Sequence, residues 1–505
     1  MPTSPRLRLA AIAAAALLPL AGCSDGGSRA AKPESLAWEP CPAPDAAEGT
    51  GQPPGPEWEC TALDVPLDYD KPDGDTIELA LIRARATDAT HRIGSLIYNF
   101  GGPGGSGVAT LPAAAKDYQR LRARYDLVSF DPRGVGRSAA VRCEDDKQLD
   151  AYYASDATPV GPAAEKTFVD NLKTYSAACE KNSGAVLPYV GTLNAARDLD
   201  RIRDALGDAK LYYFGISYGT ELGGVYAHLF PKNVGRAVFD AVVDPTNDAA
   251  QGALGQAKGF QLALGNFAKD CIDRGDECRL PGSTPKEIED GIVALQKRLA
   301  VKPIPVGDRK LTETAATGGI AQALYSKDFW PLLEQGLDEA DGGSGQLLLA
   351  LADAMNGRNQ NGTYSNIGAA NTAINCADFK DRYTLEQTKA QLPAFRAASR
   401  VFGDYLGWAM MGCTAWPVPG AWQTPDVSAP GSAPILVIGN TGDPATPYEG
   451  AGKMAEKLGS GVGVELTYKG EGHGAYDSGN PCVQKAVDGY LLDGKVPAAD
   501  SVCTR

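Results

Sequence analysis

The sequence predicts an α/β fold built around a mostly parallel sheet, and three observations support this prediction. Seven short apolar segments have the composition of buried strands, and helix-compatible segments lie between many of them. One strand also runs directly into a Gly-x-Ser-x-Gly turn that is followed by another helical segment. Strands that alternate with helices favour a parallel sheet covered by helices on both faces. We therefore expect a functional site at the carboxyl edge of this sheet.

The predicted strands are short runs of apolar, β-branched and aromatic residues bounded by turn-forming residues. They cover residues 77–82, 94–98, 126–130, 211–214, 237–243, 434–438 and 464–468. The stretch 193–206 is one of the helices that we expect between them.

The alternation stops between Thr246 and Trp422, where the pattern is helical, for example over 285–299 and 344–355, with no clear strand. A segment rich in Pro, Gly and Ser, 417–434, leads back to the sheet. We expect this stretch to be a large helical cap that covers the carboxyl edge of the sheet and shapes substrate access.

The N-terminus has the features of an export signal. Arg6 and Arg8 precede an apolar run at 9–20 that is short for a membrane span, and Cys23 follows small residues. This pattern resembles a bacterial lipoprotein signal, in which Cys23 is lipidated and becomes the mature N-terminus. The alternative is an ordinary secretory signal cleaved nearby. We expect an exported protein that is lipid-anchored on the outer face of the bacterial cell membrane, or secreted, with no membrane contact except through Cys23.

These observations divide the chain into five parts. We expect a signal peptide at 1–22, a flexible tether at 23–36, the first part of the core at 37–245, the helical cap with its return linker at 246–433, and the remaining core at 434–505.

The cysteines fit an exported protein. The chain has 11, and setting Cys23 aside leaves ten, none of them in a Cys-x-x-Cys pair. Zinc-ribbon and thioredoxin chemistry are therefore poorly supported, and we expect neither a metal nor a cofactor. Disulfides are the default outside the cytoplasm, although spacing does not determine their connectivity. Our working hypothesis is sequential pairing: Cys41–Cys60, Cys143–Cys179, Cys271–Cys278, Cys376–Cys413 and Cys482–Cys503.

The charge balance limits the possible partners. The formal net charge is -14, which argues against a nucleic-acid-binding surface. The sequence leaves the oligomeric state open.

Ser217 is the first candidate for a catalytic residue. The apolar strand at 211–214 runs into Gly215-Ile216-Ser217-Tyr218-Gly219, and a helix-compatible stretch begins at Thr220. A nucleophilic serine stands above the sheet on a sharp, strained turn, where flanking glycines avoid clashes and the following helix points its positive end at the site. The motif alone is weak in a chain with 59 glycines, because a Gly-rich turn with an ordinary serine also produces it.

A serine nucleophile needs a general base, and the chain has three histidines. His91 lies far upstream of Ser217, and His228 is three helical turns past it, so that it should point away. His473 lies in Gly470-Glu471-Gly472-His473-Gly474, a loop just after the last predicted strand. We therefore predict that His473 is the base.

The base needs an orienting carboxylate, which this arrangement of strands places between the serine and the histidine. Asp443 lies in a turn shaped by glycine and proline, Asn440-Thr441-Gly442-Asp443-Pro444-Ala445-Thr446-Pro447. The alternative is Asp244, in Val243-Asp244-Pro245. We favour Asp443, because it follows the last strand before that of the histidine.

A glycine-rich run supplies the other requirement, backbone donors for an oxyanion. Gly101-Gly102-Pro103-Gly104-Gly105-Ser106-Gly107 follows the strand at 94–98, and we expect the N–H groups of Gly102 and Tyr218 to be the donors. The run also matches Gly-x-Gly-x-x-Gly, and Asp131 ends the next strand, so a dinucleotide site is a competing interpretation. That interpretation leaves the Ser, Asp and His pattern unexplained, and Asp131-Pro132-Arg133-Gly134 fits a structural turn better.

Together, these motifs resemble the secreted tripeptidyl aminopeptidase family, whose members are actinobacterial relatives of the prolyl aminopeptidases within the α/β-hydrolase superfamily and carry a TAP-like C-terminal region. The resemblance extends from about Trp38 to Cys503. It implies an α/β-hydrolase fold and a serine exopeptidase with Ser217 as nucleophile, Asp443 as acid and His473 as base. The chain departs from the family at Glu221, where we expect an aromatic residue in relatives.

An aminopeptidase also needs a carboxylate at a fixed distance from the nucleophile to bind the substrate α-ammonium. Glu221, four residues past Ser217, and Asp378 in the cap are candidates, although each could be a solvated or structural acid. The expected function is release of short peptides, tripeptides above all, from the free N-termini of peptides or proteins. The alternatives are a carboxylesterase with the same residues and a cell-surface binding protein that has lost activity.

Overall fold

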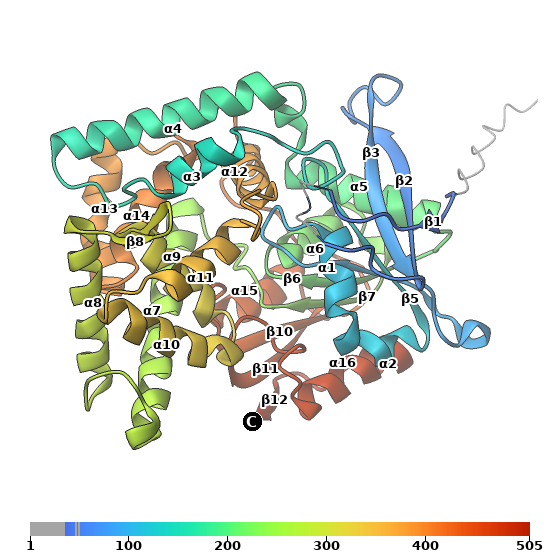
Figure 1. The fold of residues 1–505 in the computed structure, drawn as a ribbon. Coiled ribbons are helices and arrows are strands. Elements are labelled where there is room, and N and C mark those ends of the chain that lie inside the picture. The colour runs from blue at the N-terminus through green and yellow to red at the C-terminus, as the bar shows by residue number, and fades with distance from the viewer. Residues whose placement is uncertain (1–35, 46–47, 49–50, 505) are drawn as a thin grey trace, which may run out of the picture. The chain divides into compact units, whose positions relative to one another are not determined.

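The computed structural model describes residues 36–45, 48 and 51–504, so the predicted signal peptide and Cys23 lie outside the described residues. Ten strands form one sheet in the order β1-β2-β3-β5-β4-β6-β7-β10-β11-β12 (Figure 1). The strands are β1 (Glu39–Pro40), β2 (Trp58–Pro66), β3 (Thr76–Ala84), β4 (Gly94–Asn99), β5 (Tyr125–Phe130), β6 (Leu211–Ile216), β7 (Val234–Asp240), β10 (Ile435–Gly442), β11 (Gly463–Glu471) and β12 (Ser501–Thr504).

The pairing within this sheet changes direction once. β1, β2 and β3 pair antiparallel up to β5, and every pair from β5 to β12 is parallel. All seven predicted strands are present, and the predicted α/β fold class is confirmed. β1, β2 and β12 were not predicted, because none of them forms an apolar run: β1 has two exposed residues, and β2 and β12 mix buried with exposed positions.

Helices cover both faces of the sheet, and alternate residues of one strand enter different cores. The helices that cover the two faces are α1 (Gly107–Ala114), α2 (Gln119–Arg122), α5 (Thr192–Ala205), α6 (Tyr218–Leu229), α15 (Glu449–Leu458) and α16 (Pro481–Asp493). Leu96 and Leu436 pack with residues of α1 and α16, whereas Ile97 and Val437 pack with residues of α5, α6 and α15.

The stretch between β7 and β10 is mainly helical, as predicted, and has an apolar core of its own. One expectation was wrong, because a short hairpin of β8 (Ile304–Val306) and β9 (Arg309–Leu311) lies within it. Each strand of the hairpin has only three residues, too few for a periodic pattern to show. The helices are α7 (Ala249–Asp273), α8 (Pro285–Val301), α9 (Glu313–Leu324), α10 (Trp330–Asp341), α11 (Gln346–Asn356), α12 (Ile367–Asp378), α13 (Leu385–Ala398) and α14 (Gly403–Ala409).

Two further helices, α3 (Asp146–Tyr153) and α4 (Pro162–Ser183), pack against the cap although they precede it in the sequence (Figure 1). The ring of Phe168 on α4 lies 5.5 Å from that of Trp408 on α14. Glu165 forms an ion pair with Lys389 on α13. The helical layer therefore draws on two separate segments of the chain.

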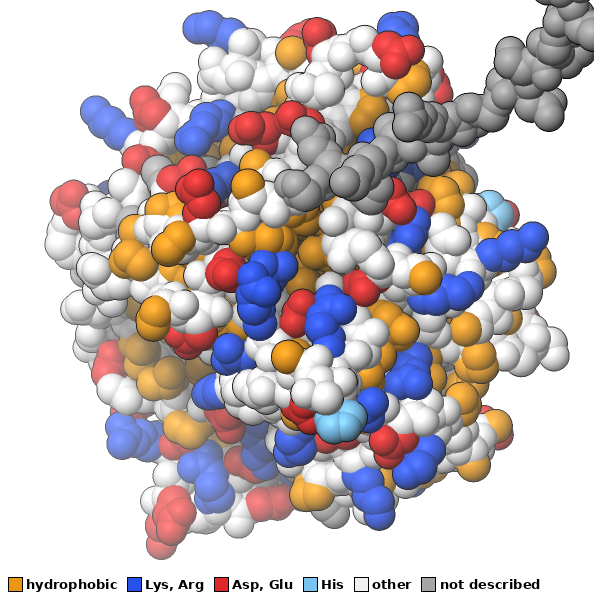
Figure 2. Space-filling view, turned by 90° about the vertical axis from the view of Figure 1, so that its right-hand side faces the viewer, with side chains coloured by type: hydrophobic (Ala, Val, Ile, Leu, Met, Phe, Trp, Pro, Cys, Tyr) orange, Lys and Arg blue, Asp and Glu red, His pale blue; other side chains and the backbone are white. Residues whose placement is uncertain are grey.

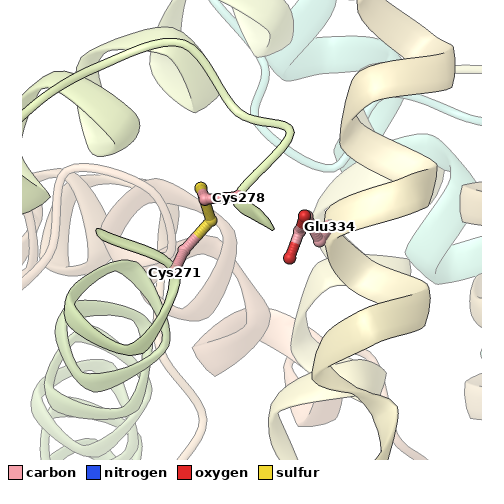
Figure 3. Close-up of side chains that lie close together, drawn as sticks. All are labelled: Cys271, Cys278 and Glu334. Atoms are coloured by element: carbon pink, nitrogen blue, oxygen red, sulfur yellow. A yellow bond between two sulfur atoms is a disulfide. The ribbon is translucent and has the colours of Figure 1, made fainter. Parts of the chain in front are cut away.

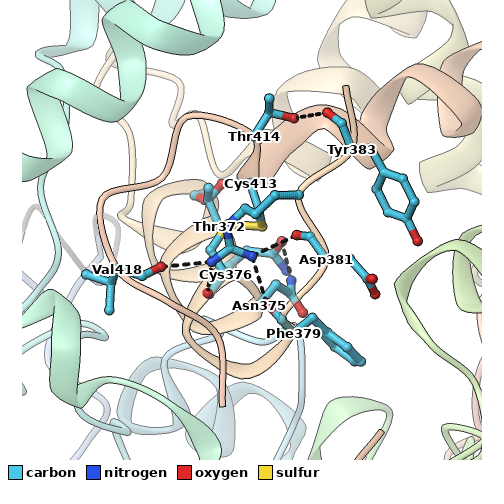
Figure 4. The surroundings of a disulfide bond; sticks show 12 residues. Thr372, Asn375, Cys376, Phe379, Asp381, Tyr383, Cys413, Thr414 and Val418 are labelled. Carbon is cyan, nitrogen blue, oxygen red and sulfur yellow. Dashed lines mark hydrogen bonds between the residues drawn. A yellow bond between two sulfur atoms is a disulfide. The ribbon is translucent and has the colours of Figure 1, made fainter. Parts of the chain in front are cut away.

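Five disulfides join the ten described cysteines in the predicted sequential order. Cys376–Cys413 ties the last turn of α12 to the end of the 3₁₀ helix at Met410–Cys413 (Figure 4). Arg382 strengthens this junction by donating hydrogen bonds to the carbonyl oxygens of Cys376, Phe379, Asp381 and Val418. The C-terminal end of α12 is thus fixed by a covalent bond and by a half-buried cation.

One group of described side chains brings ligand atoms close enough for a metal ion: Cys271, Cys278 and Glu334 (Figure 3). The two sulfurs are bonded to each other, and metal binding needs thiolates. Glu334 already forms an ion pair with Arg274 and accepts the N–H of Arg279. These contacts indicate a structural role in the cap.

Lys and Arg side chains alternate with Asp and Glu on the face that Figure 2 shows, where no extended basic surface appears. Among the described residues, none of the helices combines the length and apolar character needed to cross a membrane.

Candidate active site

Ser217 lies on the strained turn that its motif predicts, between the end of β6 and the start of α6. Its backbone angles are φ 58° and ψ -126°, a conformation that non-glycine residues rarely adopt. A Cβ at Gly215 would lie 2.4 Å from the carbonyl oxygen of Gly219, and one at Gly219 would lie 2.5 Å from that of Asn99. Both flanking glycines are therefore required by close backbone contacts.

Asp443 and His473 form a directly bonded pair at the same edge of the sheet. The Nδ1 atom of His473 lies 2.8 Å from Oδ1 and 3.1 Å from Oδ2 of Asp443. The Asp443 carboxylate also accepts the N–H groups of Ala445 and Thr446, each at 2.9 Å, and the Thr446 hydroxyl at 3.0 Å. These hydrogen bonds hold the Asp443 carboxylate in its orientation toward the imidazole.

Burial alone would lower the pKa of His473, but the Asp443 carboxylate outweighs it and raises the pKa above its ordinary value. The carboxylate of Asp240 acts in the same direction. The loop of His473 is also held by the cap, because the carbonyl oxygen of Tyr325 accepts the backbone N–H of His473 at 2.7 Å. The Tyr325 ring packs edge-on against the imidazole, with centroids 5.1 Å apart.

The glycine-rich loop lies against the serine turn. A Cβ at Gly101 would meet Ser217 Cβ at 2.8 Å and Tyr218 N at 3.2 Å, so only a glycine allows this approach. Tyr218 is the first residue of α6, and its N–H therefore has no acceptor within the helix. Gly102, at φ 111°, follows directly in this loop. The arrangement suits the two donors predicted for an oxyanion.

The competing candidates have other roles. His228 Nδ1 lies 2.8 Å from the carbonyl oxygen of Ser428, and His91 pairs with the exposed Asp88. The Asp244 carboxylate accepts the N–H and hydroxyl of Thr246 within its own turn. Asp131 is fully buried and accepts Ser106 Oγ and the N–H groups of Val108 and Arg137, so it cannot bind a ribose. The dinucleotide interpretation therefore has no support.

The structure brings the two candidate recognition acids together. Glu221, 5% exposed, lies on the first turn of α6, and the charge of Asp378, 1% exposed, contributes to raising its pKa. Asp378 is held by Thr192, whose N–H and hydroxyl donate to its carboxylate at 2.8 and 2.6 Å. The Thr192 hydroxyl also lies 2.5 Å from that of Tyr218. Thr192 thus links Asp378 to the side chain of Tyr218, the residue whose backbone N–H is a predicted oxyanion donor.

Glu221 differs from Asp378 because it has no hydrogen-bonded partner within the described part of the chain. Among the described residues, its carboxylate has neither a hydrogen bond nor a neighbouring cation. Burial, with the charge of Asp378, raises the pKa of Glu221 to about 8, and burial raises that of Asp378 to about 7. Two buried acids without a counter-ion form a site that would favour a cationic ligand.

Thr446, Thr192 and Tyr325 were not predicted from the sequence as parts of the site. Thr446 lies three residues after Asp443, a spacing typical of a side chain that closes a turn, and this signal could have identified it. Thr192 and Tyr325 come from distant segments and carry no local signal.

A serine on a strained strand-to-helix turn, with an Asp–His pair at the same edge of a parallel sheet, defines a serine hydrolase of the α/β-hydrolase class. Residues 399–503 match the family model described as TAP-like protein. The chain is 38% identical to serine protease Hip1 of Mycobacterium tuberculosis over 98% of this chain and 96% of that protein. It is 34% identical to tripeptidyl aminopeptidase of Streptomyces lividans over 95% and 89%, and 36% identical to carboxylesterase B of Mycobacterium tuberculosis over 88% and 86%. The chain belongs to this family of TAP-like α/β-hydrolases, and the resemblance inferred from its motifs is confirmed.

Proposed function

We propose that this protein is an exported serine exopeptidase that releases short peptides, tripeptides above all, from free N-termini. The observation that carries the proposal is the buried pair of Glu221 and Asp378, which has no cation among the described residues and begins one helical turn from Ser217. A peptide with a free N-terminus supplies the missing cation, whereas an acylated N-terminus or a simple ester does not.

The proposed reaction has two acyl-transfer steps. His473 takes the proton of the Ser217 hydroxyl, and the serine oxygen attacks the scissile carbonyl carbon. The N–H groups of Gly102 and Tyr218 stabilise the oxyanion, and protonated His473 gives its proton to the leaving amine. Water, activated by His473, then hydrolyses the acyl-enzyme and releases the N-terminal fragment.

Glu221 and Asp378 bind the substrate α-ammonium in this proposal. Their raised pKa values mean that the empty pair retains protons near neutral pH. A bound ammonium ion favours the charged carboxylates and displaces these protons. Charge-assisted hydrogen bonds of this kind contribute about 1.5–3 kcal/mol each, enough to dominate recognition of a short peptide.

The length of α12 supports release of a tripeptide. Asn371, the fifth of its 12 residues, donates to the carbonyl oxygen of Pro103 in the glycine-rich loop at 3.1 Å, and Asp378 is its last residue. Between Asn371 and Asp378 the helix rises by about 10 Å along its axis, at about 1.5 Å per residue. Three extended residues also span about 10 Å. A substrate amine at Asp378 would therefore place the third peptide carbonyl near the oxyanion donors.

The five disulfides support an extracytoplasmic location. A lipid anchor at Cys23 remains part of this proposal. Mass determination of the full-length protein before and after treatment with a lipoprotein signal peptidase inhibitor would test it, with Cys23→Ser as the control.

Product analysis by mass spectrometry tests the proposed activity. A peptide with a free amine should yield its N-terminal tripeptide, the N-acetylated form of the same peptide should not be cleaved, and Ser217→Ala should release nothing from either. Equal cleavage of the two peptides would contradict recognition of the N-terminus.

Carboxylesterase activity is a second candidate, favoured by the relative named carboxylesterase B. The same nucleophile hydrolyses esters, so the two functions differ in what occupies the acid pair. Hydrolysis of uncharged acyl esters with a kcat/KM above that for free-amine peptides would favour the esterase. Failure of a fluorophosphonate probe to label Ser217 in the folded protein would favour the third possibility, a binding protein without activity.

A further inference from the structure

Asp240 occupies the centre of the proposed catalytic edge. It is the last residue of β7, and it pairs with Ile216 of β6 on one side and with Ile438 of β10 on the other. These two neighbours are the strands that lead to Ser217 and Asp443. The Asp240 side chain is 1% exposed, and a buried carboxylate needs several donors to compensate its lost hydration.

The donors come from the loop that carries His473. The N–H of Ala475 donates to both oxygens of the Asp240 carboxylate, at 2.9 and 3.0 Å. The N–H of Tyr476 donates to Oδ2 at 2.9 Å. The loop is therefore anchored to the Asp240 carboxylate, beginning two residues after His473.

The backbone of Asp240 makes a second contact, with the serine turn. Its carbonyl oxygen accepts the N–H of Ser217 at 3.1 Å. One residue thus touches the backbone of the proposed nucleophile through its carbonyl and the loop of the proposed base through its carboxylate.

The other bonds to the histidine loop lack this connection. Asn440 donates to the carbonyl oxygen of Gly472 at 2.6 Å, and the carbonyl oxygen of Tyr325 accepts the N–H of His473. Within the part of the chain that the structure describes, neither of these residues is bonded to Ser217. Asp240 is therefore the shortest bonded link between the two proposed catalytic groups.

Asp240 also contributes charge. Its carboxylate helps raise the pKa of His473, and no Lys or Arg among the described residues neutralises it. Burial raises the pKa of Asp240 to about 6, so it is mainly ionised above neutral pH. The other titratable groups that act on it or are acted on by it are Asp443, Asp477 and Tyr118.

We propose that Asp240 is a positioning residue of the hydrolase reaction, which fixes the His473 imidazole relative to the Ser217 hydroxyl. The proposal rests on the catalytic roles proposed above for Ser217 and His473. Positioning matters because a displacement of about 1 Å between reacting groups can cost on the order of 100-fold in rate. The negative charge of Asp240 further stabilises the imidazolium that forms when His473 accepts the serine proton.

The test compares Asp240→Asn with Asp244→Asn, a control acid that follows the same strand and is bonded only within its own turn. Active sites are counted by fluorophosphonate labelling, and kcat per labelled site, KM and the pH dependence of kcat are measured on a free-amine peptide. We expect Asp240→Asn to lower kcat about 100-fold, with KM within twofold. In the pH profile of kcat, the limb that reports ionisation of His473 should move to lower pH, because the variant lacks a negative charge that favours the imidazolium. Asp244→Asn should match the wild type.

Asp240→Glu separates geometry from charge and serves if the asparagine variant does not fold. It should keep the pH limb of the wild type but lose kcat, because the longer side chain displaces the histidine loop. An unchanged kcat per labelled site in the folded variants, even with a lower Tm, would overturn the proposal and leave the proposed function intact. An unlabelled Ser217 in the wild type would instead refute the catalytic assignment, and the Asp240 proposal with it.

Discussion

Two buried carboxylates near the proposed nucleophile differ sharply in their surroundings. Asp443 accepts bonds from two backbone N–H groups, a hydroxyl and the His473 imidazole. Glu221 has no bonded partner among the described residues, and its pKa is raised to about 8 by burial and by Asp378. Asp443 has hydrogen-bond donors without a substrate, whereas Glu221 has none among the described residues. This difference fits a role for Asp443 in orienting the base and a role for Glu221 in binding a charged ligand.

The largest expected effect is at the complete carboxylate. Asp443→Asn should lower kcat by about 10⁴-fold and leave KM nearly unchanged, because an amide holds His473 in the wrong tautomer while substrate contacts persist. Steady-state kinetics on a free-amine peptide measure both constants. His228→Ala, a histidine bonded to Ser428, is the control and should retain wild-type kcat. A higher KM with an unchanged kcat would contradict the proposed role of Asp443.

Glu221→Gln should produce the opposite pattern at the incomplete carboxylate. We expect KM for a free-amine peptide to rise about 10- to 100-fold, because one charge-assisted hydrogen bond to the ammonium is lost. Neutral ester substrates report on Ser217 without an ammonium, and their kcat/KM should stay within twofold of the wild type. If both substrates lose activity equally, Glu221 supports the fold and does not recognise the N-terminus.

The two sites should also separate by pH. As pH falls from about 8 to 6, Glu221 and Asp378 take up protons and lose charge, because their pKa values are about 8 and 7. KM should therefore rise by up to about tenfold per pH unit for each carboxylate that must lose its proton before the ammonium binds, while kcat follows the neutral form of His473, whose pKa lies above its ordinary value. Measuring kcat and KM separately across this range tests the comparison. A KM independent of pH would exclude the acid pair from binding.

The smallest effect is expected at the disulfide beside Asp378. Replacing Cys376 and Cys413 together by serine should raise KM several-fold and lower stability by about 2–4 kcal/mol, because the end of α12 loses its covalent tie. Paired serine substitution at Cys482 and Cys503, which join the C-terminal strand β12 to α16, should lower Tm without changing KM. Thermal melts and kinetics on both variants distinguish local from general destabilisation.

The sequence could predict the parts of the site that are encoded locally. The serine turn depends on two glycines at fixed spacing, and the order of Ser217, Asp443 and His473 along the chain follows the order of the strands. Glu221 and Asp378 could be named as acids, but their proximity depends on where the fold places α12 relative to α6.

Residues that act through their backbone were beyond prediction. Tyr325 holds His473 with a carbonyl oxygen, and Asp240 holds Ser217 in the same way, so the identity of the side chain gives no signal. The contribution of α3 and α4 to the cap was missed for a related reason. Those helices precede the nucleophile in the sequence and meet the cap only through tertiary contacts such as Phe168 with Trp408.

The junction between Cys376, Cys413 and Arg382 has a consequence for when the enzyme becomes active. Asp378 lies two residues after Cys376, at a helix end that the disulfide and four carbonyl contacts keep in place. Such a bond does not persist in the reducing cytoplasm. If Asp378 binds the substrate ammonium as proposed, a newly made chain would bind its substrate several-fold more weakly until this disulfide forms.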